Sequence, residues 1–318
     1  MHYAWLFYFF KKQNCYERNN MDIKKFSAHM KNAVEKRLGE GYEVEEALIG
    51  KNNGVQLEAL VIRTSGMNIA PTIYLKSYYE NYMNGESIQS EARNLVADYR
   101  RSLPEEGFDV SFYEDYELVK KGLSYKLISA ERNTELLENI PHVPFLDLAI
   151  VFYYAFDRDG LPDGSILIRN KHMEMWNVTT EQLMKDAGEN SPKALPGVCR
   201  DIWNVLKRIQ PAEAECILEE NEPEPPMYVL SNSRMINGAA AMLYPGMLKE
   251  LSEKLDSNLY IIPSSVHEVI IFSDRLSDDK KSLTDMIYTV NRTQMDPQDI
   301  LSDSLYFYNR KEEKISIA

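Results

Sequence analysis

Three short polar segments carry the residue types that could do hydrolytic chemistry. The densest is residues 263–268 (PSSVHE), where two serine hydroxyls lie within three positions of a histidine. His142 stands between two prolines in residues 141–144 (PHVP), which favour extended backbone. Arg169 ends a short apolar segment. If these segments converged, a base, a hydroxyl and a cation would meet in one cleft. The candidate catalytic residues are therefore His142, Arg169, Ser264, Ser265 and His267.

A structural role for the same residues is the alternative, and the sequence favours it. Histidines in loops commonly hydrogen-bond to backbone, and one sequence cannot show that three separate segments meet. The nucleophile elbow Gly-x-Ser-x-Gly is missing from the chain. The Gly-x-Gly at residues 39–41 follows a predicted helix, which is the reverse of what a phosphate-binding loop requires. We therefore expect no nucleotide cofactor.

Metal binding and disulfide bonding are not expected either. The five histidines are scattered, and the aspartates of residues 157–163 lack the spacing of a calcium loop, so this segment is predicted to be a turn. Cys15, Cys199 and Cys216 make an odd number without a Cys-x-x-Cys pair. Reduced thiols in a cytoplasmic protein are the simplest interpretation.

The charge of the chain disfavours nucleic acid as a partner. The chain has 318 residues, with 36 lysines and arginines against 49 acids, a net charge of −13. The basic residues occur in pairs flanked by acids, such as Lys24-Lys25 and Lys280-Lys281, and form no stripe. The 20 tyrosines are expected to be half-buried or to serve a protein interface.

Periodicity and turn signals predict an α+β protein. Apolar residues at three- and four-residue spacing predict a helix over residues 23–38, and Asn53-Gly54 predicts a hairpin turn. Further helices are expected at 87–101, after Thr179, and at 198–209, 238–243, 247–255 and 282–291. Strands are expected at 42–49, 55–63, 71–75, 125–129, 145–156, 165–169, 227–230, 259–262, 266–272 and 304–308. Such clustered strands predict mixed, mostly antiparallel sheets packed against helices, in two sub-domains.

The domain boundary is predicted at an acidic segment. Residues 212–226 hold six glutamates and three prolines and no basic residue, which is typical of a solvated linker. It would separate an N-terminal α+β region, residues 21–211, from a C-terminal α+β region, residues 227–318.

The first 20 residues are predicted to be an extension that lies outside the folded protein. Residues 1–10 (MHYAWLFYFF) are apolar, but as a helix they would cover about half the thickness of a bilayer. Lys11 and Lys12 follow this apolar stretch, whereas a secretory signal has its positive charge before the apolar stretch. We expect no membrane span and no secretion, and a chain that begins at Met21 should fold as the full chain does. An interfacial anchor is the alternative role.

Several short segments in order resemble a bacterial family known as domain of unknown function 5688. They include residues 52–55 (NNGV), 71–75 (PTIYL), 142–154 (HVPFLDLAIVFYY), 227–232 (MYVLSN) and 261–269 (IIPSSVHEV). The second half is also similar, more loosely, to the YtpQ-like proteins. The resemblance implies a cytoplasmic bacterial protein, but it implies no activity, cofactor or catalytic residue.

These observations favour a binding protein over an enzyme. We expect a protein or small-molecule partner, bound without cofactor or metal. A hydrolase-like enzyme with a cleft of serine, histidine and arginine is the alternative, and a peripheral membrane protein is a third and weaker one.

Overall fold

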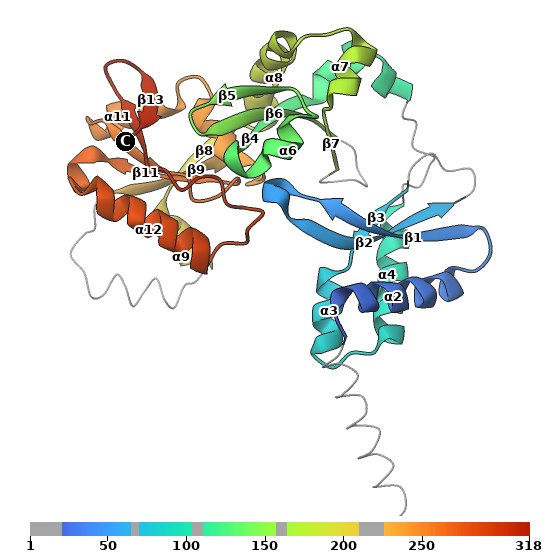
Figure 1. Cartoon of the computed structure of the whole chain (residues 1–318). Helices are drawn as coiled ribbons and strands as arrows, with labels where there is room; N and C mark the ends of the chain where they lie inside the picture. Colours follow the sequence, from blue (N-terminus) through green and yellow to red (C-terminus); the bar gives the residue numbers. More distant parts are fainter. Residues whose placement is uncertain (1–20, 65–69, 104–110, 157–163, 210–225) are drawn as a thin grey trace, which may run out of the picture. The chain divides into compact units, whose positions relative to one another are not determined.

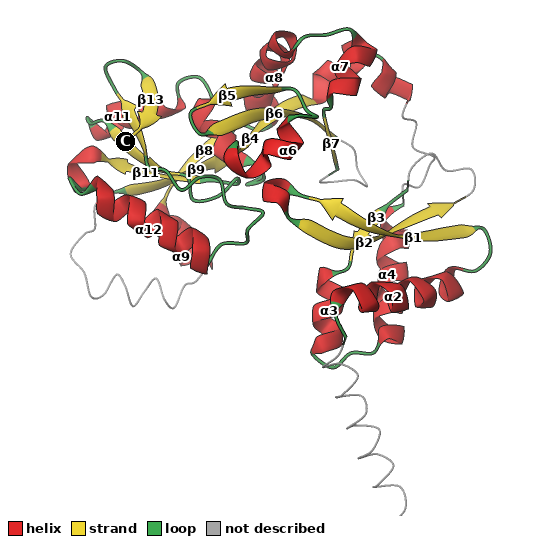
Figure 2. Ribbon diagram, in the orientation of Figure 1, coloured by secondary structure: helices red, strands yellow, loops and turns green. Residues whose placement is uncertain are grey.

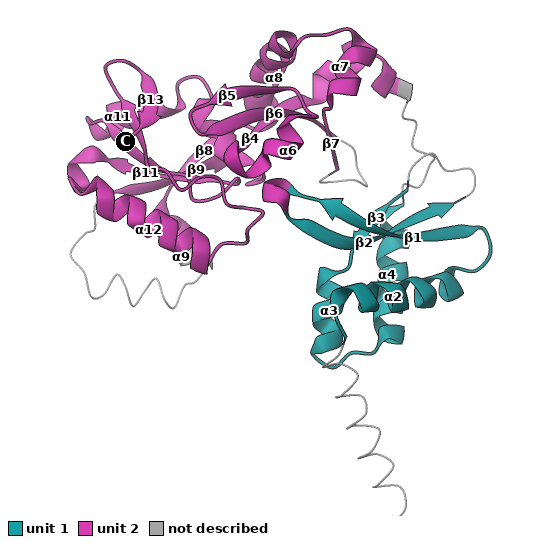
Figure 3. Cartoon of the chain, viewed as in Figure 1, with its two compact units in different colours: residues 1–51, 55–110, 158–162 teal, residues 52–54, 111–157, 163–318 magenta. Residues whose placement is uncertain are grey.

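The computed structural model forms two compact units, each with its own hydrophobic core (Figure 3). It describes residues 21–64, 70–103, 111–156, 164–209 and 226–318. Unit 1 comprises residues 1–51, 55–110 and 158–162, and unit 2 comprises residues 52–54, 111–157 and 163–318.

Unit 1 is a small antiparallel sheet packed against helices (Figure 1). Its elements are α2 (Ile23–Leu38), β1 (Tyr42–Gly50), β2 (Gln56–Thr64), β3 (Thr72–Tyr74), α3 (Lys76–Met83) and α4 (Ile88–Ser102). The sheet has the order β1-β2-β3. Its core joins Val44 and Ile62 of the sheet to Phe26 and Leu95 of the helices.

Helix α2 begins and ends where the sequence predicts. Phe26, Met30 and Val34 recur at four-residue spacing and are fully buried. The Asp22 side chain accepts a hydrogen bond from the backbone N–H of Lys25 at 2.8 Å, which caps the first turn. Gly39, with φ of 82°, ends the helix in a conformation that favours glycine.

Unit 2 contains two antiparallel sheets (Figure 2). The smaller sheet consists of β4 (Leu123–Ser129), β5 (His142–Phe145), β6 (Leu148–Ala155) and β7 (Ser165–Leu167), with β6 paired to all three others. The larger sheet has the order β13-β12-β10-β11-β9-β8. Its strands are β8 (Gly197–Asp201), β9 (Met227–Asn232), β10 (Leu259–Ile262), β11 (Val269–Ser273), β12 (Tyr306–Asn309) and β13 (Lys314–Ile317).

Helices and 3-10 turns connect and cover these sheets. The helices are α5 (Tyr116–Val119), α6 (Thr134–Leu137), α7 (Asn170–Trp176), α8 (Thr180–Ala194), α9 (Ile202–Ile209), α11 (Met247–Leu255) and α12 (Lys280–Thr293). The 3-10 helix η5 (Gly238–Leu243) packs with α8 and α11 into a core that both sheets share. A separate cluster, which includes Tyr260 and Ile287, packs α12 against the larger sheet. All strand pairs of the described residues are antiparallel, so the predicted α+β class is confirmed.

Two predicted elements are wrong in detail, and one strand is missing from the prediction. The apolar segment 145–156 is two strands, because the chain turns at Leu146-Asp147 between β5 and β6. Residues 198–209 begin as strand β8 and become helical only at Ile202. Strand β13 was not predicted, because it has only four residues and follows a charged segment, so its alternation of polar and apolar residues is too short to recognise.

The predicted domain boundary stays a prediction. Residues 210–225, which hold most of the acidic segment, lie outside the described residues, as do residues 1–20. The segments on either side of the acidic stretch both belong to unit 2.

Candidate functional site

Three of the predicted site residues, Ser264, Ser265 and His267, lie on the loop between β10 and β11. The Ser265 hydroxyl is buried and accepts a hydrogen bond from the backbone N–H of His267 at 3.0 Å. The Ser264 hydroxyl donates to Glu268 Oε1 at 3.4 Å. Each hydroxyl therefore stabilises the loop itself, and neither bonds to an imidazole nitrogen in the described residues.

Both ring nitrogens of His267 face other partners. Nδ1 accepts a hydrogen bond from the backbone N–H of Asn237 at 3.2 Å, which leaves the proton on Nε2. Nε2 lies 3.5 Å from Asp299 Oδ1. A general base needs a free nitrogen within reach of the hydroxyl that it activates. Here the imidazole clamps two segments of unit 2 together instead.

His142 and Arg169 lie elsewhere in unit 2. His142 begins β5, and its Nδ1 donates to the carbonyl of Ile140 at 3.1 Å. Arg169 precedes α7, and its backbone N–H donates to His172 Nδ1 at 3.1 Å. Burial, and after it the charge of Arg169, lowers the pKa of His172, which keeps Nδ1 an acceptor. Among the described residues, no hydrogen bond or ion pair joins His142 or Arg169 to the loop of Ser264, Ser265 and His267.

Backbone strain points to another part of unit 2. Seven described non-glycine residues have positive φ, and four of them are asparagine or aspartate, which tolerate it. The other three are Leu146, Met235 and Glu313. An aliphatic residue in this conformation costs about 1–2 kcal/mol. Residues held in such conformations cluster at functional sites, where the surrounding structure enforces them.

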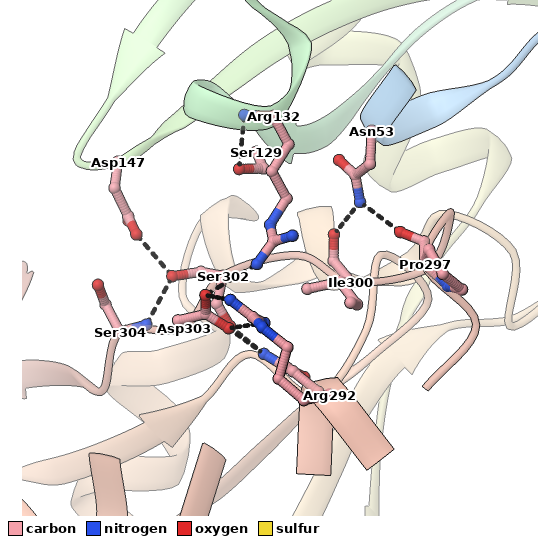
Figure 4. Close-up of polar contacts among 11 residues, drawn as sticks. Asn53, Ser129, Arg132, Asp147, Arg292, Pro297, Ile300, Ser302, Asp303 and Ser304 are labelled. Atoms are coloured by element: carbon pink, nitrogen blue, oxygen red, sulfur yellow. Dashed lines mark hydrogen bonds and ion pairs between the residues drawn. The ribbon is translucent and has the colours of Figure 1, made fainter. Parts of the chain in front are cut away.

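The Leu146 turn is enforced by the residue that follows it. Phe145 pairs with Leu148, so Leu146 and Asp147 form a two-residue hairpin loop. The Asp147 carboxylate accepts a hydrogen bond from the Ser302 hydroxyl at 2.5 Å (Figure 4). It accepts a second one from the Tyr306 hydroxyl at 2.6 Å. These bonds hold the turn in place, although its first residue, with φ of 54°, stands where glycine is usual.

The loop that carries Ser302 is held in turn by charged and amide groups. Asp303 accepts from Arg132 at 2.8 Å and from Arg292 at 3.0 Å (Figure 4). Burial alone would raise the pKa of Asp303, but its hydrogen bonds from Arg292 and Asn291 and the charge of Arg132 outweigh burial and lower it. The Asn53 amide donates to the carbonyls of Pro297 and Ile300, at 2.8 and 2.7 Å. This network fixes the segment to which the Leu146 turn is bonded.

Leu146 and Glu313, two of the three strained residues, line the same pocket. The pocket has a volume of about 530 Å³, within the range of small-ligand sites. It lies among the β5–β6 turn, η5, α11, β12 and β13, and we call it the η5 pocket. Its lining residues are Pro144, Phe145, Leu146, Met242, Leu243, Tyr244, Gly246, Leu248, Lys249, Tyr308, Glu313, Lys314 and Ile315.

The lining of the η5 pocket is mixed: most of its residues are apolar, and two lysines, a glutamate and two tyrosines add polar groups. Met242, Tyr244, Leu248 and Tyr308 are buried, whereas the Leu146 side chain remains 40% exposed. Lys249 and Glu313 form an ion pair. Burial raises the pKa of Tyr244, so its hydroxyl stays protonated. An apolar lining with a few placed polar groups is typical of a small-molecule site.

None of the predicted site residues lines this pocket. Titratable clusters and motifs do not indicate it, because the pocket is built mainly from leucine, methionine, tyrosine and phenylalanine, which also form ordinary cores. The Pro144-Phe145-Leu146-Asp147 segment was the one available signal, because an aspartate within an apolar run indicates a break.

The fold and the pocket define an α+β protein whose second unit contains a pocket of about 530 Å³. The chain belongs to the Family of unknown function (DUF5688), whose family model matches residues 23–310. That match confirms the predicted family and includes most of the η5 pocket.

The other comparisons add no relatives. No curated protein and no solved structure matches the chain significantly, and the similarity to YtpQ-like proteins finds no support. Of the helices in the described ranges, none combines the length and hydropathy that a membrane crossing needs.

Proposed function

We propose that this protein binds a small, mostly apolar molecule in the η5 pocket. The observation that carries the proposal is the position of Leu146, an exposed leucine held at positive φ on the pocket wall. Leucine there costs stability twice, through backbone strain and through apolar exposure. Such a residue is understandable if its side chain contacts a ligand.

The η5 pocket supports ligand binding better than it supports catalysis. The η5 pocket contains lysines, a glutamate and tyrosines, but none of the predicted candidates His142, Arg169, Ser264, Ser265 and His267. Within the described ranges, the His267 ring bonds to the backbone of Asn237 and lies beside Asp299, and no hydroxyl is bonded to it. A cytoplasmic bacterial location and a partner other than nucleic acid belong to this proposal, and the acidic charge of the chain supports the latter.

The proposal is tested with a neutral apolar dye. N-phenyl-1-naphthylamine is titrated into the full chain, and its fluorescence reports transfer from water into an apolar site. We expect saturable binding by the natural chain. Leu146→Asn should weaken it about fivefold to thirtyfold, because a leucine contact worth about 1–2 kcal/mol is lost. Asparagine accepts positive φ, so the turn itself should persist.

Leu276→Asn is the matched control. Leu276 is 39% exposed, against 40% for Leu146, and it lies on a 3-10 turn away from the pocket lining. This variant should bind the dye as the natural chain does. Absence of saturable binding by the natural chain, or an equal effect of the two substitutions, would refute the proposal.

A further inference from the structure

A second pocket lies in unit 1, between α3 and α4, and we call it the α3–α4 pocket. Its volume is about 350 Å³, within the range of small-molecule sites. In contrast to the η5 pocket, nearly all of its lining side chains are polar. The lining residues are Ser77, Tyr78, Asn81, Glu91, Asn94, Ala97, Asp98 and Arg101.

Glu91 is the buried charge of this lining. It is 1% exposed, whereas the side chains of Asp98 and Arg101 are 40% and 78% exposed. The Glu91 carboxylate accepts hydrogen bonds from Asn94 Nδ2 at 3.0 Å and from Asn81 Nδ2 at 3.1 Å. Both partners are neutral, and no cation among the described residues forms an ion pair with Glu91. Buried charges in proteins are normally paired with an opposite charge, because desolvation is costly.

The contacts of Glu91 also decide which atoms of the two asparagines remain available. A carboxylate only accepts hydrogen bonds, so each asparagine presents its amide nitrogen to Glu91 and its amide oxygen elsewhere. Neither amide oxygen accepts a hydrogen bond from the part of the chain that the structure describes. Asn81 and Asn94 are exposed residues that line the pocket, so a ligand can reach them.

The donors of the lining are bonded to Asp98. The Tyr78 hydroxyl donates to this carboxylate, and burial, followed by this hydrogen bond, raises the pKa of Tyr78 and keeps it protonated. Arg101 forms an ion pair with Asp98. Since that pair is neutral as a whole, Glu91 leaves the pocket with one net negative charge.

We propose that the α3–α4 pocket binds a small organic cation with N–H donors, such as a primary amine. The ammonium donates to the free amide oxygens of Asn81 and Asn94. Its charge compensates that of Glu91, which solvent screens weakly because the carboxylate is buried. The two pockets share no residue, so this site is independent of the proposed function.

Other classes of ligand fit this lining less well. An anion would meet the charge of Glu91 and the carboxylate of Asp98. An apolar molecule would find one aliphatic residue, Ala97, in the lining. A metal ion would need more ligands, and no group of three or more histidine, cysteine, aspartate or glutamate side chains in the described ranges could hold one.

Four ligands with the same butyl chain separate these classes. Butylammonium, butyltrimethylammonium, 1-butanol and butyrate are titrated into the full chain at neutral pH and low ionic strength, and ligand-observed NMR measures binding. We expect butylammonium to bind about tenfold more tightly than butanol, because its hydrogen bonds are charge-assisted. Butyltrimethylammonium, which has the charge without an N–H group, should bind at least about threefold more weakly than butylammonium. Butyrate should bind most weakly.

Two substitutions assign the binding to this pocket. Glu91→Gln removes the charge at nearly constant size and should weaken butylammonium about tenfold while leaving butanol unchanged. Glu80→Gln is the matched control, because Glu80 is an exposed glutamate of α3 that does not line the pocket. Ala97→Phe fills the pocket from an exposed helix position, so it should weaken butylammonium even if Glu91→Gln fails to fold.

The proposal fails if butylammonium does not bind, or if butanol, butyrate or butyltrimethylammonium binds as tightly. It also fails if Glu91→Gln and Glu80→Gln have equal effects, or if Ala97→Phe binds butylammonium as the natural chain does. Ala97→Phe should leave binding of the apolar dye unchanged, and Leu146→Asn should leave binding of butylammonium unchanged. The two pockets are therefore tested separately, and failure of one proposal is distinguishable from failure of the other.

Discussion

Leu146 marks a candidate site through its backbone conformation and exposure, which its residue type alone would not indicate. Positive φ is ordinary for Asn53 or Asn237, whose side chains tolerate it, but not for a leucine. A leucine at this turn also exposes apolar surface. Both features disfavour the folded state, so a role for the side chain is the simplest explanation. His267 is the opposite case. Its residue type suggests catalysis, but its ring contacts Asn237 and Asp299 and so connects two segments of unit 2.

The backbone strain at Leu146 reverses the usual order of stability of two substitutions. Leu146→Gly should be more stable than Leu146→Ala by about 1 kcal/mol, because alanine keeps the Cβ strain and glycine removes it. At Leu276, which lacks positive φ, alanine should be the more stable of the two. Urea unfolding of the four variants measures both differences. Equal values for Gly and Ala at position 146 would mean that the turn is not strained.

At the scale of elements, the β5–β6 hairpin depends on contacts that are distant in sequence. Its two-residue loop lacks the Asn-Gly or Asp-Gly that favours such turns. Asp147 replaces that local preference with hydrogen bonds to Ser302 and Tyr306, more than 150 residues later in the chain. The smaller sheet is therefore tied to the segment that enters β12, and the wall of the η5 pocket is set by this connection.

A double-mutant cycle on Asp147 and Tyr306 tests this connection. Asp147→Ala should cost about 2–4 kcal/mol of unfolding free energy, because it removes the acceptor of the buried Tyr306 hydroxyl. Combined with Tyr306→Phe, the loss should be smaller than the sum of the single losses by about 1 kcal/mol or more. Chemical denaturation of the four proteins measures the coupling, with Asp285→Ala, on the exposed side of α12, as a control. Additive losses would contradict a direct contact.

At the scale of the whole molecule, the hydrophobic residues form separate clusters. The core of unit 1 includes Phe26, Leu60 and Leu95, whereas the main core of unit 2 includes Leu127, Phe152 and Leu230. No described residue belongs to both cores. Segments with separate cores can open separately, each with its own free energy.

A cavity in one core should therefore loosen that unit first. Leu95 is fully buried in α4, and Leu95→Ala should cost about 2–5 kcal/mol. We expect faster amide exchange in α2, α3 and α4, with unchanged protection in β6. Leu127→Ala in β4 is the reciprocal variant and should loosen unit 2. Hydrogen exchange read by mass spectrometry measures both, and equal acceleration throughout the chain would show a single cooperative unit.

The sequence by itself determined the elements that are specified by residues close to one another in the chain, such as caps and regularly spaced apolar residues. The cap at Asp22, the four-residue spacing of Phe26 and Met30 and the glycine at 39 predict α2. Thr179, which accepts from the backbone N–H of Gln182 at 3.3 Å, starts α8 in the same way. These signals also predict the α+β class, because they fix how strands and helices follow one another along the chain.

Only the tertiary structure decided where the chain turns at Leu146 and where the η5 pocket lies. Asp147 indicates a break in the apolar run, but the turn is stabilised by Ser302 and Tyr306, which no pattern near position 146 could identify. The pocket assembles five elements, and its apolar residues do not differ by type from those of a core. Propensity and capping act over neighbouring residues, whereas the contacts that enforce a strained turn and the walls of a pocket arise only when distant segments meet.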